Sequence, residues 1–421
     1  MRILFVHQNF PGQYVHIVQR LARLGDHQLV ALGINALDRS RPLPDSLHYL
    51  RYRLQRGNTK GIHPLVMETE TKLIRAEACV KAAERLKAKG FEPDLICAHP
   101  GWGEALFLKA IWPSSPLLCY QEFFYKDQGY DSNFDSEFPE EIGWQSQAKL
   151  IMKNAYLHLT LEQADWNISP THFQASSFPE HWQSKISVIH DGIDTRKAVP
   201  NLSPEPLTLP DGTVLMKGEP IVTFVNRRLE PYRGCHTFLR SIPDLQRHSP
   251  DARIVIVGET KGVSYGAACP DGEWKDKFLA EIEGQYDSSR VHYTGKLPYD
   301  QFLQLMQLSA CHVYLTYPFV MSWSLLEAMA CGCAVVGSDT APVREVIQHG
   351  INGLLVDFFS PLDLASAVAE LLQDRERAAA FGAEARRTVE RSYDLDVCVQ
   401  RQLALMDLVA SGSINALTKS G

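Results

Sequence analysis

One stretch, residues 314–345, decides the fold, and its sequence is YLTYPFVMSWSLLEAMACGCAVVGSDTAPVRE. The apolar run 313–316 predicts a short buried strand. Apolar residues with helical spacing predict a helix over 324–331, which a glycine ends, and 334–336 predicts the next strand. Strand, helix and strand in this order are typical of an open α/β sheet with parallel strands.

The predicted helix begins just past the carboxyl end of a strand, which is where open parallel sheets bind ligands. Ser322, Ser324 and Glu327 lie at or near its N-terminus, where backbone N–H groups and the helix dipole favour an anion. Ser324 and Glu327 also have the spacing of a capping box, and the local pattern alone slightly favours that interpretation. The alternative is a carboxylate that accepts hydrogen bonds from sugar hydroxyls.

Four segments extend this pattern: EAMACG at 327–332, AVVGSD at 334–339, EVI at 345–347 and HGINGLLV at 349–356. Together they resemble the donor site of retaining glycosyltransferases of family 4, which have the GT-B fold. The resemblance implies an α/β protein with two Rossmann-like, doubly wound domains that face an interdomain cleft. The family usually has two glutamates separated by seven residues. The second corresponds to Glu327, whereas the first position holds Phe319.

The composition indicates two globular domains and argues against several protein classes. With 421 residues and 45 % hydrophobic composition, the chain can bury two cores. A net charge of −7 argues against a general nucleic-acid binder, and no apolar run reaches the roughly 18 residues that span a bilayer. The chain begins directly with a strand-like run, so we expect no secretory signal peptide. Nine scattered cysteines without a Cys-x-x-Cys pair indicate reduced thiols in a cytoplasmic protein.

A βαβ unit is predicted at the N-terminus, with a strand at 3–6, a loop at 8–13, a helix at 14–24 and a strand at 27–32. Gly12 permits close approach of a ligand to the backbone, although a single glycine is more often a turn residue. The segment HQNFPGQ resembles the N-terminal loop of a bacterial branch of the same family. In that family the loop faces the donor phosphates and the acceptor, which implies donor binding by Gly12.

Two further strands deliver polar side chains to the same edge of the first sheet. The predicted strand 94–98 ends at His99, and the predicted strand 117–120 ends just before Glu122. On local grounds His99 either caps the next helix or contacts a ligand. The family has a histidine here that contacts the donor sugar near its reacting centre, which implies that role for His99. Glu122 is a candidate for binding the acceptor.

Two charged segments each have two interpretations. Segment 39–60 has six basic residues and one acid, and it could meet an anionic lipid carrier or membrane surface. A solvated face is the interpretation that we favour, because basic faces are common. Segment 126–148 is acidic and carries aromatic residues. It is either an acceptor-recognition insertion or a plain surface loop.

The predicted strand 221–225 is followed by the tight loop NRRLEPYRG at 226–234. Two guanidinium groups on a strand-to-helix loop suit a diphosphate, because arginine forms forked hydrogen bonds to phosphate oxygens. A surface turn with ordinary salt bridges is the alternative. The family has Arg and Lys at the positions of Arg228 and Arg233, which favours phosphate binding.

The remaining donor contacts are implied by the resemblance alone. The backbone around Lys296 would hold the base, Glu327 would bind the ribose hydroxyls, and N–H groups near Ser322 would bind sugar hydroxyls. The residues implied in donor binding are Gly12, Gly295, Lys296, Leu297, Phe319, Val320, Met321 and Ser322.

The predicted domains are an acceptor-side domain at 1–198 and a nucleotide-sugar domain at 221–396. The stretch 199–220 holds five prolines without strong periodicity and is predicted to be the linker. A C-terminal helix within 397–421 is predicted to cross back to the first domain, as it does in this fold.

We therefore predict a retaining, metal-independent glycosyltransferase. It would move a sugar from a nucleotide-diphosphate sugar to a sugar or lipid-linked acceptor in glycan, polysaccharide or glycolipid synthesis, without a cofactor. Arg228 and Arg233 would neutralise the leaving diphosphate, and a phosphate oxygen would take the acceptor proton, as in the family mechanism. Asp394 and Asp396 have the spacing of a metal-binding pair, but a helix cap is the better interpretation. The predicted catalytic residues are His99, Arg228, Arg233 and Glu327.

Phe319 leaves alternatives open, because the missing carboxylate normally grips the donor sugar in the family. They are a nucleotide-binding pseudoenzyme or assembly partner with the GT-B fold and, less favoured, a nucleotide-sugar epimerase. We expect no nucleic-acid partner and a cytoplasmic location, with peripheral contact at the inner face of the cell membrane left open. The sequence does not predict the base, the sugar, the acceptor or the oligomeric state.

Overall fold

The computed structural model describes residues 1–37, 43–139 and 143–414. Its internal contacts divide the chain into two compact units, Met1–Gly192 with Leu395–Gly421, and Ile193–Asp394.

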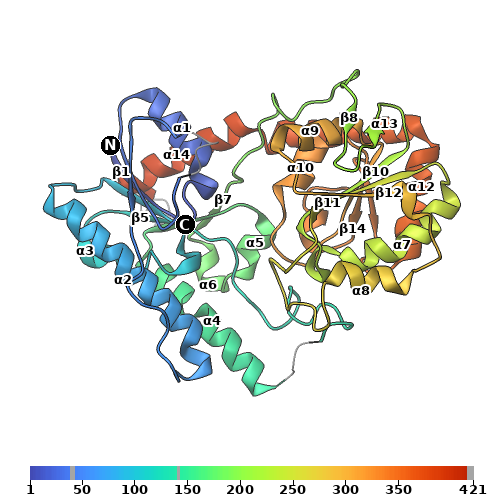
Figure 1. Cartoon of the computed structure of the whole chain (residues 1–421). Helices are drawn as coiled ribbons and strands as arrows, with labels where there is room; N and C mark the ends of the chain where they lie inside the picture. Colours follow the sequence, from blue (N-terminus) through green and yellow to red (C-terminus); the bar gives the residue numbers. More distant parts are fainter. Residues whose placement is uncertain (38–42, 140–142, 415–421) are drawn as a thin grey trace. The chain divides into compact units, whose positions relative to one another are not determined.

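The first unit is built around a parallel sheet, whose strands β1, β5 and β7 are labelled in Figure 1. Its strand order is β3-β2-β1-β4-β5-β6-β7. The chain starts in the middle, runs outward to β3 and then returns to the other side of β1, which is the doubly wound order. The strands are β1 (Arg2–Val6), β2 (Gln28–Gly33), β3 (Leu47–Arg51), β4 (Leu95–Ala98), β5 (Leu117–Tyr120), β6 (Trp166–Ser169) and β7 (Ile186–Val188).

Helices cover both faces of this sheet because its strands are apolar on both sides. In β1, Ile3 and Phe5 pack with residues of α1 and α14, whereas Leu4 and Val6 pack with residues of α2 and α3. The helices of this unit are η1 (Gly12–Tyr14), α1 (Val15–Leu24), η2 (Pro64–Val66), α2 (Met67–Ala88), η3 (Pro100–Trp102), α3 (Leu108–Ile111), α4 (Trp144–Gln163), α5 (His172–Ser177), α6 (Glu180–Gln183) and α14 (Leu395–Ala410).

The second unit repeats the same plan with the strand order β12-β11-β10-β13-β14-β15, again all parallel. The predicted α/β class with two Rossmann-like sheets is confirmed. The strands are β10 (Ile221–Arg228), β11 (Arg253–Glu259), β12 (Val291–Gly295), β13 (Cys311–Tyr314), β14 (Val335–Ser338) and β15 (Leu354–Val356).

Helices also cover both faces of the second sheet. On one face Phe224 of β10 stacks on Phe238 of α7, with ring centroids 4.2 Å apart, and α7 packs on α12. The helices are η4 (Pro231–Arg233), α7 (Cys235–His248), α8 (Trp274–Glu281), η5 (Ser288–Arg290), α9 (Tyr299–Leu308), α10 (Trp323–Ala330), α11 (Ala341–Arg344), α12 (Pro361–Gln373) and α13 (Arg375–Ser392).

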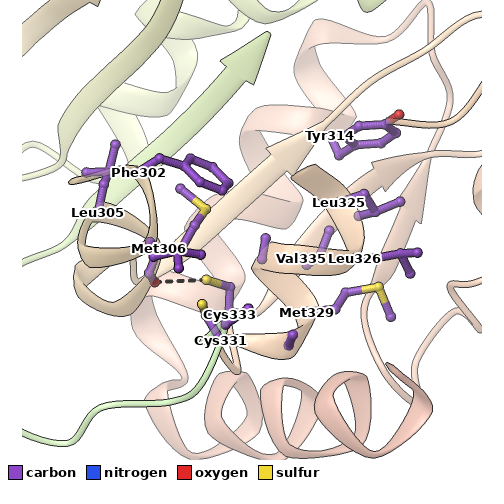
Figure 2. Packing of buried hydrophobic residues seen from close by; sticks show 14 of the residues in the cluster. Phe302, Leu305, Met306, Tyr314, Leu325, Leu326, Met329, Cys331, Cys333 and Val335 are labelled. Atoms are coloured by element: carbon purple, nitrogen blue, oxygen red, sulfur yellow. Dashed lines mark hydrogen bonds between the residues drawn. The ribbon is translucent and has the colours of Figure 1, made fainter. Parts of the chain in front are cut away.

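The other face of the second sheet carries a core around α10. Figure 2 shows Leu325 and Met329 of α10 in the cluster that Met306 of α9 also joins. Cys331 and Cys333 belong to the same buried cluster, and the Cys333 thiol donates to the Met306 carbonyl oxygen over 3.0 Å. The two cysteines therefore pack within the core, and burial raises the pKa of both thiols.

The stretch 199–220, predicted as a linker, is part of the second unit. It contains a small antiparallel hairpin of β8 (Leu207–Thr208) and β9 (Val214–Leu215). Leu207 and Leu215 are buried in the core of that unit. The five prolines thus shape a packed connection, because proline also suits turns and short edge strands.

Each sheet has one point at which the strand order reverses, between β1 and β4 in the first unit and between β10 and β13 in the second. Loops at the carboxyl ends of such neighbouring strands leave in opposite directions and open a crevice. The predicted site residues lie at the ends of these four strands, in the segments that follow them, just after β5, or at and just after the end of β12.

Close packing of α13 on α10 yields a test of the fold. A Cβ on Gly382 would lie far inside van der Waals contact of the Gly332 carbonyl oxygen. We expect Gly382→Ala to lower the free energy of unfolding by about 2 kcal/mol, because backbone must move. Gly57→Ala is the control, since nothing lies within 4 Å of its Cβ. Equal denaturant midpoints for the two variants would contradict this packing.

Candidate active site

Arg233 lies at the centre of the switch point in the second unit. It ends η4, and its side chain is only 7 % exposed. Its guanidinium donates to Thr316 Oγ1 and to the Val320 carbonyl oxygen, both over 2.8 Å. Both acceptors follow β13, so this one side chain joins the loops after β10 and β13.

Arg228, the other predicted phosphate ligand, lies at the end of β10 and has different partners. It pairs with Glu259 over 2.9 Å and donates to the Lys261 carbonyl oxygen. Its side chain is 33 % exposed. Arg228 therefore faces the loop between β11 and α8, whereas Arg233 faces the end of β13.

Glu230 connects these two arginine sites, and our sequence analysis did not identify it. It is 1 % exposed, and its Oε2 accepts the backbone N–H of Ser264 and, over 3.2 Å, that of Tyr265. Burial raises the pKa of Glu230, although those N–H groups and the charges of Arg233 and Arg228 oppose the shift. The sequence pattern that could have identified Glu230 is an acidic residue between two arginines in one tight loop.

The loop that Glu230 holds places an aromatic ring on Arg233. The Arg233 Cζ lies 5.2 Å from the Tyr265 ring centroid, a cation–π distance. Phe319 packs edge-on against the same ring, with centroids 5.0 Å apart, and against Tyr232 at 5.7 Å. The position where the family usually has a carboxylate thus carries a buried aromatic contact.

Glu327 is not part of a capping box. The cap of α10 is Ser322, whose Oγ accepts the Ser324 N–H over 3.3 Å, so Glu327 lies beyond the first turn. Its carboxylate instead accepts a hydrogen bond from the Tyr299 hydroxyl, while burial raises the pKa of Glu327. The carboxylate is therefore free of the capping role that the local pattern slightly favoured.

Tyr299 also brings the predicted base-binding segment to Glu327. β12 ends at Gly295, whose φ of +64° turns the chain, and the exposed Lys296 and half-buried Leu297 follow before α9 begins. At the start of α10, the Ser322 N–H donates to the Tyr314 hydroxyl over 2.8 Å. Gly295–Leu297, Val320–Ser322, Arg233 and Glu327 thus lie in loops and helix ends at one edge of the second sheet.

His99 lies at the switch point of the first unit, directly after β4. Its Nδ1 accepts the Gly101 N–H over 3.1 Å, so in the neutral ring the proton is on Nε2. The ring stacks on Trp102 with centroids 4.6 Å apart. It is 1 % exposed, and burial holds the pKa of His99 well below its usual value. The Nε2 lies 4.0 Å from Glu122 Oε2.

Position 12 requires a glycine, because a neighbouring ring leaves no room for a side chain. It has φ +49°, and a Cβ on it would overlap the imidazole of His7. The close neighbour in this structure is therefore a side chain of the same loop. His7 donates from Nε2 to Gln13 Oε1 over 2.7 Å, and neither residue was identified from the sequence.

The other charged motifs have partners of their own. Asp394, in the second unit, accepts from Thr195 Oγ1 over 2.6 Å, and Asp396, in the first unit, lies 3.9 Å from Arg20. In the basic segment, Arg56 pairs with Glu70 over 2.8 Å.

Arg39 and Arg41 of the basic segment, and Glu140 and Glu141 of the acidic segment, lie outside the described residues. None of the helices in the described part of the chain has the length and apolar character that crossing a membrane requires.

Several solved structures share the fold of this chain. Sucrose-phosphate synthase from Thermosynechococcus elongatus superposes with a TM-score of 0.70 and 17 % identity, covering 98 % of this chain and 100 % of that one. HepE of Anabaena, solved in complex with UDP and glucose, gives 0.65 and 16 %, covering 97 % and 99 %. The predicted GT-B fold is confirmed by these neighbours.

Family models then identify the chain more closely. The model described as glycosyl transferase family 4 group matches residues 25–198, and the model described as glycosyl transferases group 1 matches residues 210–388. The two models match separate parts of the chain and both describe glycosyltransferases, so the chain belongs to the glycosyltransferases.

Curated relatives are similar at a moderate level. Spore coat protein SA of Bacillus subtilis is 24 % identical over 355 residues, which cover 80 % of this chain and 82 % of that protein. A GDP-mannose-dependent phosphatidylinositol monomannoside mannosyltransferase of Mycobacterium tuberculosis is 32 % identical over 176 residues, which cover 40 % of this chain and 43 % of that protein.

The role of Glu230 can be tested by hydrogen exchange. We expect Glu230→Ala to release the N–H groups of Ser264 and Tyr265, so that the 261–265 loop exchanges at least about tenfold faster. Loss of a charged acceptor for two half-buried donors costs more than the roughly 1.4 kcal/mol that a tenfold change requires. Glu283→Ala, at an exposed site, is the control. Unchanged exchange in this loop would show that Glu230 does not hold it.

The buried imidazole of His7 predicts a pH-dependent stability. Burial lowers its pKa from 6.5 to about 4, so between these values the unfolded chain binds a proton that the folded ring excludes. Stability should therefore fall as pH decreases, by about 1.4 kcal/mol per pH unit from this residue. Urea unfolding measures the free energy of unfolding at pH 7 and at pH 5. Between these pH values it should fall by about 2 kcal/mol less in His7→Gln than in wild type. Equal losses would refute a neutral, buried His7.

Proposed function

We propose that the protein is a retaining, metal-independent glycosyltransferase that uses a nucleotide-diphosphate sugar and transfers the sugar to an acceptor in glycan, polysaccharide or glycolipid synthesis. The observation that carries the proposal is the hydrogen-bonding state of Arg233. Among the described residues, every hydrogen bond that the Arg233 guanidinium donates comes from its Nη1. Nε and Nη2 therefore remain for phosphate oxygens, with the start of α10 close by.

The second unit would hold the donor. Arg233 and Arg228 would neutralise the charge that develops on the leaving diphosphate. Backbone N–H groups from Val320 to Ser322 would bind sugar hydroxyls, and Glu327 would bind the ribose hydroxyls, for which its hydrogen bond to Tyr299 orients it. The base would lie against Gly295–Leu297.

The first unit would contribute His99 to the transferred sugar and Glu122 to the acceptor. In the family mechanism the acceptor oxygen attacks on the face that the diphosphate leaves. The bond from the anomeric carbon to the diphosphate breaks as the new glycosidic bond forms, and a phosphate oxygen takes the acceptor proton. No protein base is needed for that step.

The comparisons support the donor class. HepE was solved with UDP and glucose, and the mycobacterial relative is named as GDP-mannose-dependent, so both bases belong in the assay. A cytoplasmic location accords with nine free cysteines, of which eight are buried. A lipid-linked acceptor with peripheral membrane contact through the described part of the basic segment 39–60 is the less favoured form of the proposal.

Nucleotide release from UDP-, GDP- and ADP-sugars tests the function. Wild type should release nucleotide from at least one donor, in EDTA, with the anomeric configuration retained by NMR of the product. Arg228→Ala should lower kcat by about 10²-fold, as removal of one transition-state donor does. Arg227→Ala is the matched control on the same strand, because Arg227 is exposed and has no proposed role.

The outcomes separate the alternatives. Equal loss in the Arg227→Ala and Arg228→Ala variants would refute the phosphate role of Arg228. Tight nucleotide binding without turnover of any donor would instead indicate a binding protein. Activity that EDTA abolishes and Mg²⁺ restores would refute metal independence.

A further inference from the structure

A chain of hydrogen bonds in the first unit starts at His7. Its Nδ1 accepts the Asn9 N–H over 3.0 Å, which leaves the ring proton on Nε2. That Nε2–H donates to Gln13 Oε1 over 2.7 Å. The orientation of the Gln13 amide is therefore fixed, because the flipped amide would put its NH₂ group against another donor.

Gln13 passes this orientation on to Glu122. With its oxygen bound to His7, its Nε2 points to Glu122 Oε1 at 3.5 Å. This distance is at the outer limit for a hydrogen bond, so Gln13 favours one orientation of the carboxylate without binding it tightly. The second oxygen, Oε2, then faces His99.

His99 has an unused donor at this place. Its Nδ1 is taken by Gly101, and its buried Nε2 has no hydrogen-bond partner among the described residues. Glu122 Oε2 is 4.0 Å away, which is too far for a direct bond. A buried donor without an acceptor costs about 1–3 kcal/mol, so a ligand atom that satisfies it would be bound preferentially.

The gap has the geometry of one bridging oxygen. An atom about 2.8 Å from both Nε2 and Oε2 would have an angle of about 90° between its two hydrogen bonds. It must accept from the imidazole and donate to the carboxylate, which a hydroxyl does and which a phosphate or carboxylate oxygen does not. A negative group would also be repelled by Glu122.

We propose that Gln13 is a positioning residue, which turns Glu122 so that its Oε2 and the Nε2–H of His99 together hold one uncharged sugar hydroxyl. The hydroxyl belongs either to the transferred sugar or to the acceptor sugar. The inference rests on the proposed function only in this assignment to a substrate, because the subsite itself is defined by contacts within the first unit.

Kinetics of full-length variants test the positioning role and identify the source of the hydroxyl. Gln13→Met keeps the size of the side chain and removes its polar atoms. It should raise the KM of one substrate about tenfold with kcat within about twofold, since one oriented charged hydrogen bond is lost. A raised donor KM assigns the hydroxyl to the transferred sugar, and a raised acceptor KM to the acceptor.

A double-mutant cycle separates positioning from a structural effect. If Gln13 acts through Glu122, then Gln13→Met with Glu122→Gln should be no worse than Glu122→Gln alone. Gln28→Met, at the exposed start of β2, is the control and should match wild type. Additive losses, or unchanged KM values in Gln13→Met, would overturn the proposal.

If the protein turns over no sugar nucleotide, that result refutes the proposed function but not the subsite. Binding measurements then test the subsite. The probes are methyl α-D-glucoside and myo-inositol in saturation-transfer difference NMR. Signals that are present in wild type and Gln28→Met, but lost in Gln13→Met and Glu122→Gln, support the subsite. No signal in wild type, or equal signals in all four proteins, would overturn it.

Discussion

The hydrogen bonds of the Arg233 guanidinium are the contact on which the candidate donor site depends. They join the loops after β10 and β13, the two strands between which the order of the second sheet reverses. Arg233 is only 7 % exposed, and a buried guanidinium needs fixed acceptors. The Arg233 side chain therefore fixes the positions of Thr316 and Val320 and places a positive charge beside them.

The two units share a strand plan but offer different chemistry at their switch points. The edge of the first sheet presents the imidazoles of His7 and His99, which burial keeps neutral at pH 7, and the carboxylate of Glu122. Such a set suits hydroxyl groups. The second presents guanidinium groups and the start of α10, which suit phosphate. A nucleotide sugar and a sugar acceptor contain both kinds of group.

The sequence predicted most of the fold for two reasons. Buried parallel strands are continuous apolar runs, and the helices between them have apolar residues at helical spacing. It also predicted that the candidate site residues follow the ends of strands, which is where the structure has them. It failed where a partner is distant in the chain. Glu230 binds a backbone N–H 34 residues away, Glu327 bonds to Tyr299 instead of the cap, and 199–220 packs on a core. No local pattern encodes those contacts.

Cysteine placement has a practical consequence for watching this enzyme at work. Eight of the nine thiols are buried, and Cys269 is the partly exposed one. It lies in the connection between β11 and α8, the same connection whose earlier residues Glu230 ties down. A maleimide dye added to the native protein would therefore attach at a single place without any engineered cysteine. Its fluorescence would report on movements of that segment as nucleotide arrives and leaves.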